Sequence, residues 1–117
     1  MPGIDDVRRL ALALPDIEEG TSYRTPAWKV RGKLFARLRE DGETLAIFVD
    51  FMEREALIAE NPRAFEVTDH YRDYPMVLVH LGPVDPEELR ELLIESWRRR
   101  APKWLLADYD DANPPSG

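Results

Sequence analysis

The chain of 117 residues has no cysteine, which excludes disulfides, thiolate zinc sites, iron–sulfur clusters and cysteine nucleophiles. It has two histidines, His70 and His80, too few for a histidine-rich metal site. The longest unbroken apolar runs, Leu10–Leu14 and Leu45–Val49, are five residues each, far below the roughly 20 residues that cross a bilayer and short for the core of a signal peptide. The six glycines are scattered and form no phosphate-binding loop. We therefore expect no metal, no cofactor, no membrane partner and a cytoplasmic location.

A basic excess is also lacking. The chain carries 16 basic and 23 acidic residues, a net charge of −7, whereas nucleic-acid binders usually carry a positive excess because phosphate contacts dominate their affinity. The charge is unevenly distributed along the sequence. The segment from Gly20 to Arg39 has six basic residues and no acidic one, so the other 97 residues carry −13. This asymmetry makes the basic segment the first candidate for a binding surface.

Apolar spacing and capping residues predict three helices. Apolar residues recur at intervals of three and four residues over Ile4–Leu14, which predicts the first helix, and Pro15 ends it. A short second helix is predicted over Met52–Glu60. The third begins after an N-cap at Asp85, with a proline in its first position, and closes on three arginines at its negative dipole end. Lys103–Ala107 adds one further turn.

Alternating and apolar segments predict the strands. Thr21–Leu38 alternates between apolar and charged residues, with a turn at Gly32. Asp41-Gly42 is a hairpin turn signal. The strand Thr44–Asp50 is apolar on both faces and is therefore expected at the centre of a sheet. Two further strands are predicted over Phe65–Thr68 and Met76–Leu81.

The order of the elements predicts an α+β fold of two layers. It runs helix, three strands or four, helix, two strands, helix, which gives an antiparallel sheet of about five strands with three helices on one face. One domain is expected over residues 1–107, because 44% of the chain is hydrophobic and 33% charged, as in folded proteins. Residues 108–117, acidic and proline-containing, are expected to form a flexible tail.

Five blocks of the sequence occur in a recognisable order: Leu14-Pro15, Ser22–Ala36, Val67–Tyr71, Tyr74–Val79 and Ala101–Lys103. In these blocks the chain resembles the MmcQ/YjbR-like family of small bacterial proteins. The resemblance extends over almost the whole chain, from the first helix to about Leu105, and a methionine at position 76 replaces the aromatic residue that is more frequent there. The resemblance implies an α+β fold akin to secretion-chaperone-like domains. It also implies a DNA-binding, double-winged surface, and it attaches no reaction to the chain.

The basic residues of the Gly20–Arg39 segment are the first candidate site. Alternation places Lys29, Arg31, Arg37 and Arg39 on one side of a hairpin, with Arg24 and Lys33 nearby. A two-stranded ribbon can enter a major groove, where arginines reach phosphates or guanine edges. The alternative is an ordinary solvated face whose charges neighbouring acids balance.

The polar and aromatic connection Asp69–Pro75 is the second candidate. A histidine oriented by a carboxylate can act as a general base. Neighbouring residues of an extended chain point to opposite sides, however, and no nucleophile is visibly paired with His70. We therefore expect no catalytic residue. The connection is either a structural loop or part of a polar pocket formed by His70, Tyr71, Tyr74 and Lys103.

Lys103, held after Pro102 near the arginines at 98–100, is a third candidate and suggests a second anion site. The alternative is that these charges complement the C-terminus of a helix. Trp104 is expected to anchor the final turn in the core.

The sequence thus leads to three hypotheses of different kinds. The first is a non-enzymatic binding protein whose partner is nucleic acid. The second is a protein-interaction or chaperone-like adaptor, and the third is a small-molecule binder or enzyme that uses His70, Tyr71 and Lys103. The choice between a monomer and a homodimer stays open.

Overall fold

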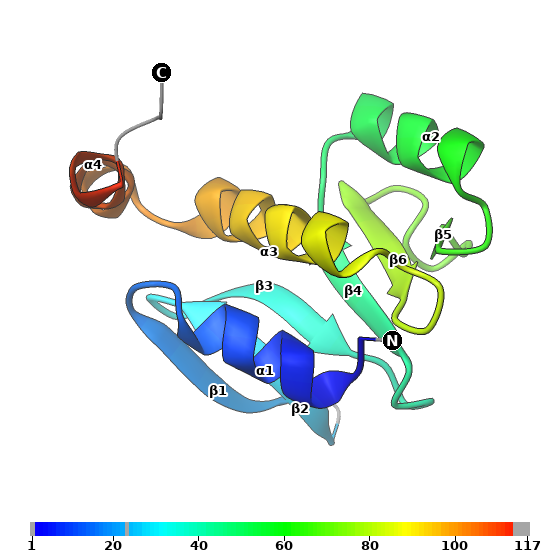
Figure 1. Ribbon diagram of the computed structural model, residues 1–117, viewed down its shortest axis with the longest axis horizontal. Helices are drawn as coiled ribbons and strands as arrows, with labels where there is room; N and C mark the ends of the chain where they lie inside the picture. Colours follow the sequence, from blue (N-terminus) through cyan, green and yellow to red (C-terminus); the bar gives the residue numbers. More distant parts are fainter. Residues whose placement is uncertain (1, 23, 114–117) are drawn as a thin grey trace.

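The computed structural model describes residues 2–22 and 24–113, which form four helices and six strands (Figure 1). In chain order these are α1 (Ile4–Leu12), β1 (Ile17–Ser22), β2 (Thr25–Val30), β3 (Lys33–Leu38), β4 (Thr44–Phe48), α2 (Phe51–Glu60), β5 (Phe65–Glu66), β6 (Met76–His80), α3 (Pro86–Arg100) and α4 (Lys103–Ala112).

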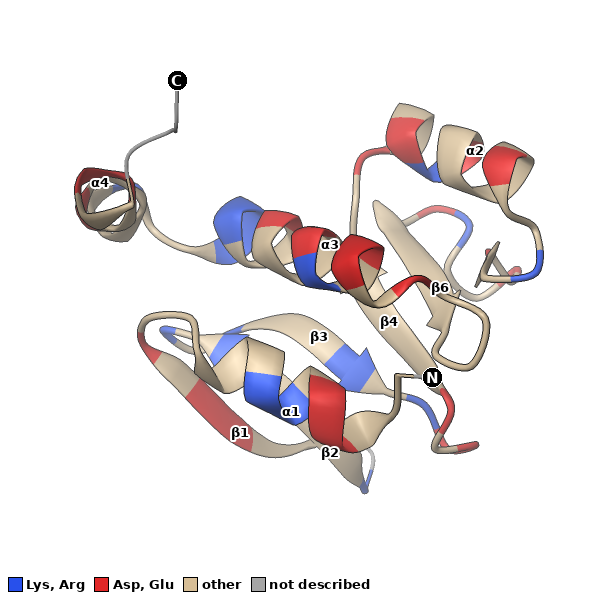
Figure 2. Cartoon of the chain, viewed as in Figure 1, with Lys and Arg blue, Asp and Glu red and all other residues tan. Residues whose placement is uncertain are grey.

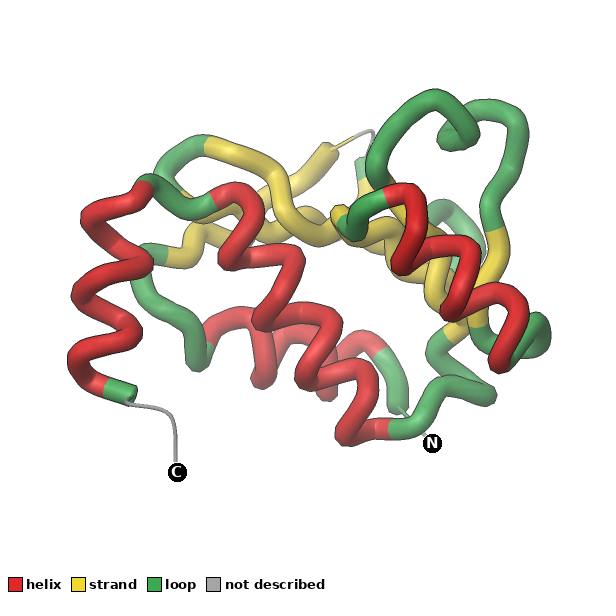
Figure 3. The backbone as a smooth tube through the Cα atoms, turned by 90° about the horizontal axis from the view of Figure 1, so that it is seen from above, coloured by secondary structure: helices red, strands yellow, loops and turns green. Residues whose placement is uncertain are grey.

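The strands form a single antiparallel sheet in the order β1-β2-β3-β4-β6-β5. Viewed from above, α1, α3 and α4 lie on one side of the strands, and α2 overlaps the strands at one end of the sheet (Figure 3). The predicted α+β fold of two layers is confirmed, with one more strand and one more helix than the five and three expected. Within the described residues, no helix is long and apolar enough to span a membrane.

The strand that the prediction missed is β1, at the edge of the sheet. We expected strand structure only from Thr21, whereas β1 begins at Ile17. It pairs with β2 through Ile17 opposite Val30 and Ser22 opposite Thr25. As an edge strand it is exposed along most of its length, so its sequence carries no apolar alternation to reveal it.

The fourth helix is α4, of which only the first turn was predicted, and the expectation of a flexible tail from residue 108 is wrong at least to Ala112. Two contacts extend the helix beyond the single turn we expected. The ring of Tyr109 packs on Trp97 with centroids 4.9 Å apart, and Asp110 accepts a hydrogen bond from Arg98 at 2.8 Å. Residues 114–117 of the predicted tail lie outside the described part of the chain.

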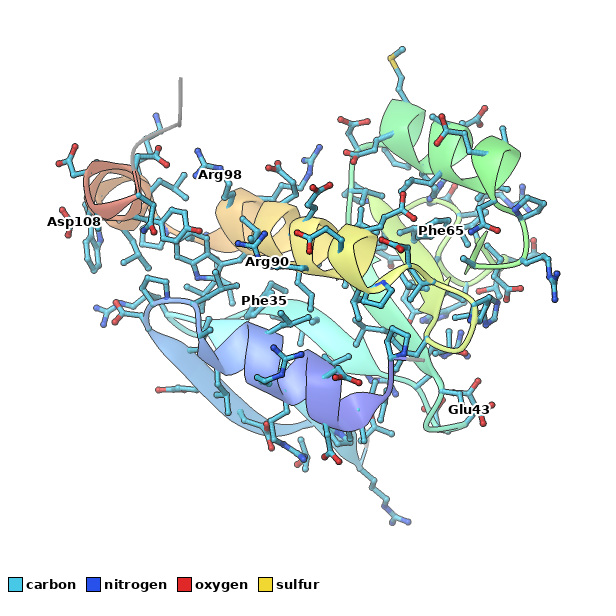
Figure 4. The ribbon with its side chains drawn as sticks, viewed as in Figure 1. Phe35, Glu43, Phe65, Arg90, Arg98 and Asp108 are labelled. Carbon is cyan, nitrogen blue, oxygen red and sulfur yellow. The ribbon has the colours of Figure 1, made fainter. Side chains whose placement is uncertain are left out.

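The main core lies between the sheet and the helices, where Phe35 is drawn between β3 and α3 (Figure 4). β4 supplies Leu45 and Ile47 to this core and turns Ala46 toward a smaller cluster on the opposite face of the sheet. Tyr71 covers that second cluster. The prediction that β4 is a central strand buried on both faces is therefore confirmed.

Helix α3 contacts the backbones of both β3 and β4 at the point where the two strands diverge. The buried hydroxyl of Ser96 donates to the carbonyl of Phe35 at 2.5 Å and accepts from the amide of Phe48 at 3.0 Å. It thereby replaces ladder hydrogen bonds that the separated strands cannot make with each other. One turn later, Arg100 donates to the carbonyl of Leu34 at 2.9 Å. These contacts fix the end of α3, and hence the start of α4, beside the β2–β3 hairpin.

Candidate functional site

The β2–β3 hairpin ends in a two-residue turn at Arg31 and Gly32. Their φ angles of 49° and 85° match a type I′ turn, whose twist suits a hairpin. The start of α4 lies against this turn, because the guanidinium carbon of Arg31 is 5.4 Å from the ring centre of Trp104. We call Arg31, Lys33, Lys103 and Trp104 the tip surface. It joins two parts of the chain that the sequence analysis treated separately.

Trp104 is not the core anchor that we expected. Its side chain is 52% exposed, whereas Trp28 and Trp97 are fully buried. Lys33 and Lys103 are exposed as well. An exposed indole among three cations is the combination that stacks a base and holds its phosphates.

The expectation that Lys29, Arg31, Arg37 and Arg39 share one exposed face is wrong. Arg37 is only 8% exposed. Its guanidinium pairs with Glu40 at 2.6 Å and donates to the carbonyl of Ser22 at 3.3 Å. The physical cause is a register shift between Trp28 and Lys29 together with the I′ turn, which breaks the simple alternation across the hairpin.

The remaining basic residues of the segment also separate in space. Lys29 is exposed but stands opposite Glu18 on the neighbouring strand. Arg24 lies in the β1–β2 turn, at the other end of β2 from Arg31. Arg39 follows β3 at that same end, with its guanidinium carbon 5.5 Å from the ring centre of Tyr71. Of the six candidates, only Arg31 and Lys33 belong to the tip surface.

The Asp69–Pro75 connection is held by a residue that the sequence analysis did not single out. Arg54 of α2 is 7% exposed. Its Nη1 donates to the carbonyls of Tyr74 at 2.9 Å, Met76 at 3.1 Å and Tyr71 at 3.3 Å. Its Nη2 donates to the carbonyl of Arg72 at 3.0 Å. The guanidinium thus supplies donors to three carbonyls of the loop and one at the start of β6, which makes this connection a structural element.

The proposed pocket of His70, Tyr71, Tyr74 and Lys103 does not form. The first three belong to the loop that Arg54 holds, at the end of the sheet near α2, whereas Lys103 starts α4 at the opposite end (Figure 1). Tyr71 is buried and its hydroxyl lies 3.3 Å from Nη1 of Arg37. His70 and Tyr74 are exposed, and the ring of His70 meets Tyr71 edge-on at 4.8 Å.

A row of hydrogen-bonded polar side chains lies where β4 begins and β6 ends. It contains a hydroxyl, a histidine and carboxylates, the residue types of many catalytic groups. Nδ1 of His80 is 3.3 Å from Oγ1 of Thr44, and its Nε2 is 3.1 Å from Oε2 of Glu66. The hydroxyl of Thr44 donates its single proton to Asp41 at 2.6 Å. This bond holds the pKa of the Asp41 carboxyl below its ordinary value. Thr44 is buried, and through these contacts the arrangement ties together β4, β5 and β6.

The three arginines that close α3 are bound within the protein. Arg98 pairs with Asp110, Arg99 with Asp50 at 3.2 Å, and Arg100 with the carbonyl of Leu34. The hydrogen bond between Arg98 and Asp110 raises the pKa of the guanidinium and lowers that of the carboxyl. These arginines do not extend the tip surface. Among the described residues, no group of three or more histidine and acidic side chains is placed to hold a metal ion.

Sequence signals existed for some of the missed residues. Arg54, Leu57 and Ile58 follow the i, i+3, i+4 spacing of one helix face, so the arginine shares the face that leucine and isoleucine bury. The meeting of Arg31 with Trp104 has no such signal, because 73 residues separate them and only the tertiary fold brings them together.

Comparisons with known proteins agree with one another. The family model described as YjbR matches residues 12–99. Uncharacterized proteins of Mycobacterium bovis and Mycobacterium tuberculosis are each 32% identical over 123 residues, covering 90% of this chain and 93% of the relative. A crystal structure of the Deinococcus radiodurans protein DR2400, a DUF419 domain, matches with a TM-score of 0.73 and 27% identity, covering 83% of this chain and 77% of that one.

Proposed function

We propose that this chain, which belongs to the YjbR family, binds single-stranded nucleic acid through its tip surface. The observation that carries the proposal is the half-exposed indole of Trp104, which lies against the guanidinium of Arg31. The exposed Lys33 and Lys103 are close to this pair in the sequence, two residues after Arg31 and one residue before Trp104. A base stacks on an aromatic face whatever its identity, and the cations hold the phosphates beside it. The proposed activity is binding without a chemical reaction.

The charge distribution supports this site over the rest of the molecule. Lysine and arginine lie at the β2–β3 turn, whereas acidic residues mark β1, α2, the start of α3 and also α4 (Figure 2). Repulsion by these acids disfavours a polyanion on the acidic surfaces. In a chain with a net charge of −7, the exposed cations of the tip surface therefore offer phosphates a local site.

The exposed ring favours a single strand over a duplex. In a duplex the bases are already stacked and paired, so an indole gains nothing unless it unstacks them. The buried Arg37 also removes one of the four side chains that would have read a major groove. We therefore expect a single strand to bind more tightly than the duplex of the same length.

The test is the affinity of the full chain for a fluorescein-labelled 12-mer of deoxythymidine, measured by anisotropy at 50 and 200 mM salt. Neutralising about three phosphates predicts a log–log slope of about −2, or a loss of roughly 20-fold over this range. Lys33→Gln and Lys103→Gln should each weaken binding several-fold and make the slope shallower by about 0.7. Lys29→Gln is the matched control, because this exposed lysine of the same hairpin faces Glu18.

Two results would contradict the proposal. One is the absence of binding at 50 mM salt with tens of micromolar protein. The other is a loss of affinity in Lys29→Gln as large as that in Lys33→Gln, which would assign any binding to diffuse charge.

A further inference from the structure

Helix α2 has apolar side chains on its solvent-exposed side and a charged side chain, Arg54, on the side that packs against the rest of the protein. Met52, Ala56 and Ala59 follow the i, i+4, i+7 spacing of one helix face, and all three are exposed. The opposite side of the helix buries Arg54 and Leu57. A surface helix ordinarily has the reverse arrangement, with its polar side outward. We call Phe51, Met52, Ala56 and Ala59 the α2 outer face.

The residues of the α2 outer face are exposed to an unusual degree. Met52 is 86% exposed and Phe51 is 47% exposed. The guanidinium of Arg54 lies 4.9 Å from the ring centre of Phe51 and also donates to the backbone carbonyl of Tyr74, another exposed aromatic residue, so both residues contact the same buried side chain. Single exposed apolar residues are ordinary, whereas a group that includes methionine and aromatic side chains is typical of a protein interface.

Acidic residues lie within this face and along one side of it. At 100° per residue, Glu55 lies between Ala59 and Phe51, and Glu53 and Glu60 flank the row of Met52, Ala56 and Ala59 on its other side. The side of Glu53 and Glu60 faces acids of α3. Burial raises the pKa of Glu53, and the charges of Asp50 and Glu95 raise it further. Burial and the charges of Asp85 and Glu60 likewise raise the pKa of Glu88. Both helices are marked by acidic residues where they approach (Figure 2).

We propose that the α2 outer face is a docking site for a basic, amphipathic helical segment of another protein. The small side chains of Ala56 and Ala59 leave room for a helix to approach closely, and the flexible Met52 adapts to its apolar residues. Lysine or arginine on the flanks of that segment would meet the acidic residues of α2. A second copy of this chain fits poorly, because two α2 outer faces in contact would bring Glu55 and Glu60 against like charges.

This site is separate from the proposed nucleic-acid site. Helices α2 and α4 stand at opposite ends of the molecule (Figure 1). The two proposals therefore succeed or fail independently, and together they describe an adaptor with a nucleic-acid end and a protein end.

The probe for the test is a fluorescein-labelled synthetic 14-mer of leucine and lysine with the leucines at helical spacing. A second peptide replaces every lysine with glutamate. We expect the lysine peptide to bind the full chain with a micromolar Kd and the glutamate peptide not to bind. Met52→Ala should weaken binding of the lysine peptide at least fivefold, and Ala56→Arg at least tenfold. Both substitutions are at exposed positions, and circular dichroism would confirm the fold.

Leu12→Ala is the matched control, because Leu12 is 48% exposed on α1. It should change the Kd less than twofold. Equal binding of the two peptides, or the same Kd in the wild type, Met52→Ala and Ala56→Arg, would overturn the proposal. So would a dimer in light scattering that Ala56→Arg dissociates, since that result would assign the face to a second copy.

Discussion

At the scale of single residues, three arginines that look alike in the sequence have three different surroundings. Arg31 stands exposed over an indole, Arg37 is buried against Glu40, and Arg54 is buried among carbonyls. A buried guanidinium has five donors to satisfy, and its removal leaves its acceptors without partners. The local sequence indicates the positive charge but not whether the fold uses it inside or outside.

Arg54→Met should lower the free energy of unfolding by about 2 to 4 kcal/mol, because four carbonyls lose their donor while the aliphatic volume is kept. Arg63→Met, at an exposed position just after α2, should change it by less than about 0.5 kcal/mol. Urea denaturation measures both values. Amide exchange should accelerate in residues 71–76 of the first variant only, and unchanged exchange there would contradict the clamping role of Arg54.

Glu19 should make the stability of the protein depend on pH. Hydrogen bonds from Arg8, and after it from Trp28, hold the pKa of this carboxyl below its ordinary value. Its contribution is therefore present above the unfolded pKa, near 4.3, and is lost as the pH falls through the lower folded pKa. Glu19→Gln should cost up to about 1 kcal/mol at pH 7 and nothing at about pH 2. Glu18→Gln is the matched control, and an equal loss in both variants at pH 7 would contradict this account.

At the scale of the elements, most helices and strands could be located from local signals, namely capping residues and apolar periodicity. The predicted N-cap at Asp85 accepts a hydrogen bond from the amide of Glu88, and Asp50 caps α2 in the same way through the amide of Glu53. The edge strand β1 and the second half of α4 escaped prediction, because tertiary contacts and not apolar periodicity hold them in place. The burial of Arg37 escaped it because one register shift changed which side chains share a face.

The turn at the tip supplies a test at this scale. Gly32 has a φ of 85°, and a Cβ there would meet nothing within 4 Å, so the cost of a side chain is conformational only. Gly32→Ala should lower the free energy of unfolding by about 1 to 2 kcal/mol. Gly20→Ala, within β1 and without a positive φ, should leave stability unchanged or raise it by about 0.5 kcal/mol. Thermal denaturation compares the two, and equal effects would contradict the I′ assignment.

At the scale of the whole molecule, the fold converts an uneven sequence into two unlike ends. Two cations of the basic segment, Arg31 and Lys33, and the lysine after Pro102 belong to the tip surface at one end, whereas acids of α2 and α3 lie beside an apolar face at the other end (Figures 1 and 2). The sequence predicted the charge asymmetry and the fold class. It did not predict which cations remain exposed, because that depends on contacts such as those of Arg37 with Glu40 and Ser22.

The most direct test of the account is the intrinsic fluorescence of the chain during titration with the deoxythymidine 12-mer. Trp28 and Trp97 are fully buried, so a stacked base can quench only Trp104. We predict partial quenching that saturates with binding, and its loss in Trp104→Phe, whose phenyl ring still stacks and keeps most of the affinity. Binding without quenching in the wild type, or quenching that persists in Trp104→Phe, would contradict a nucleic-acid site at the tip surface.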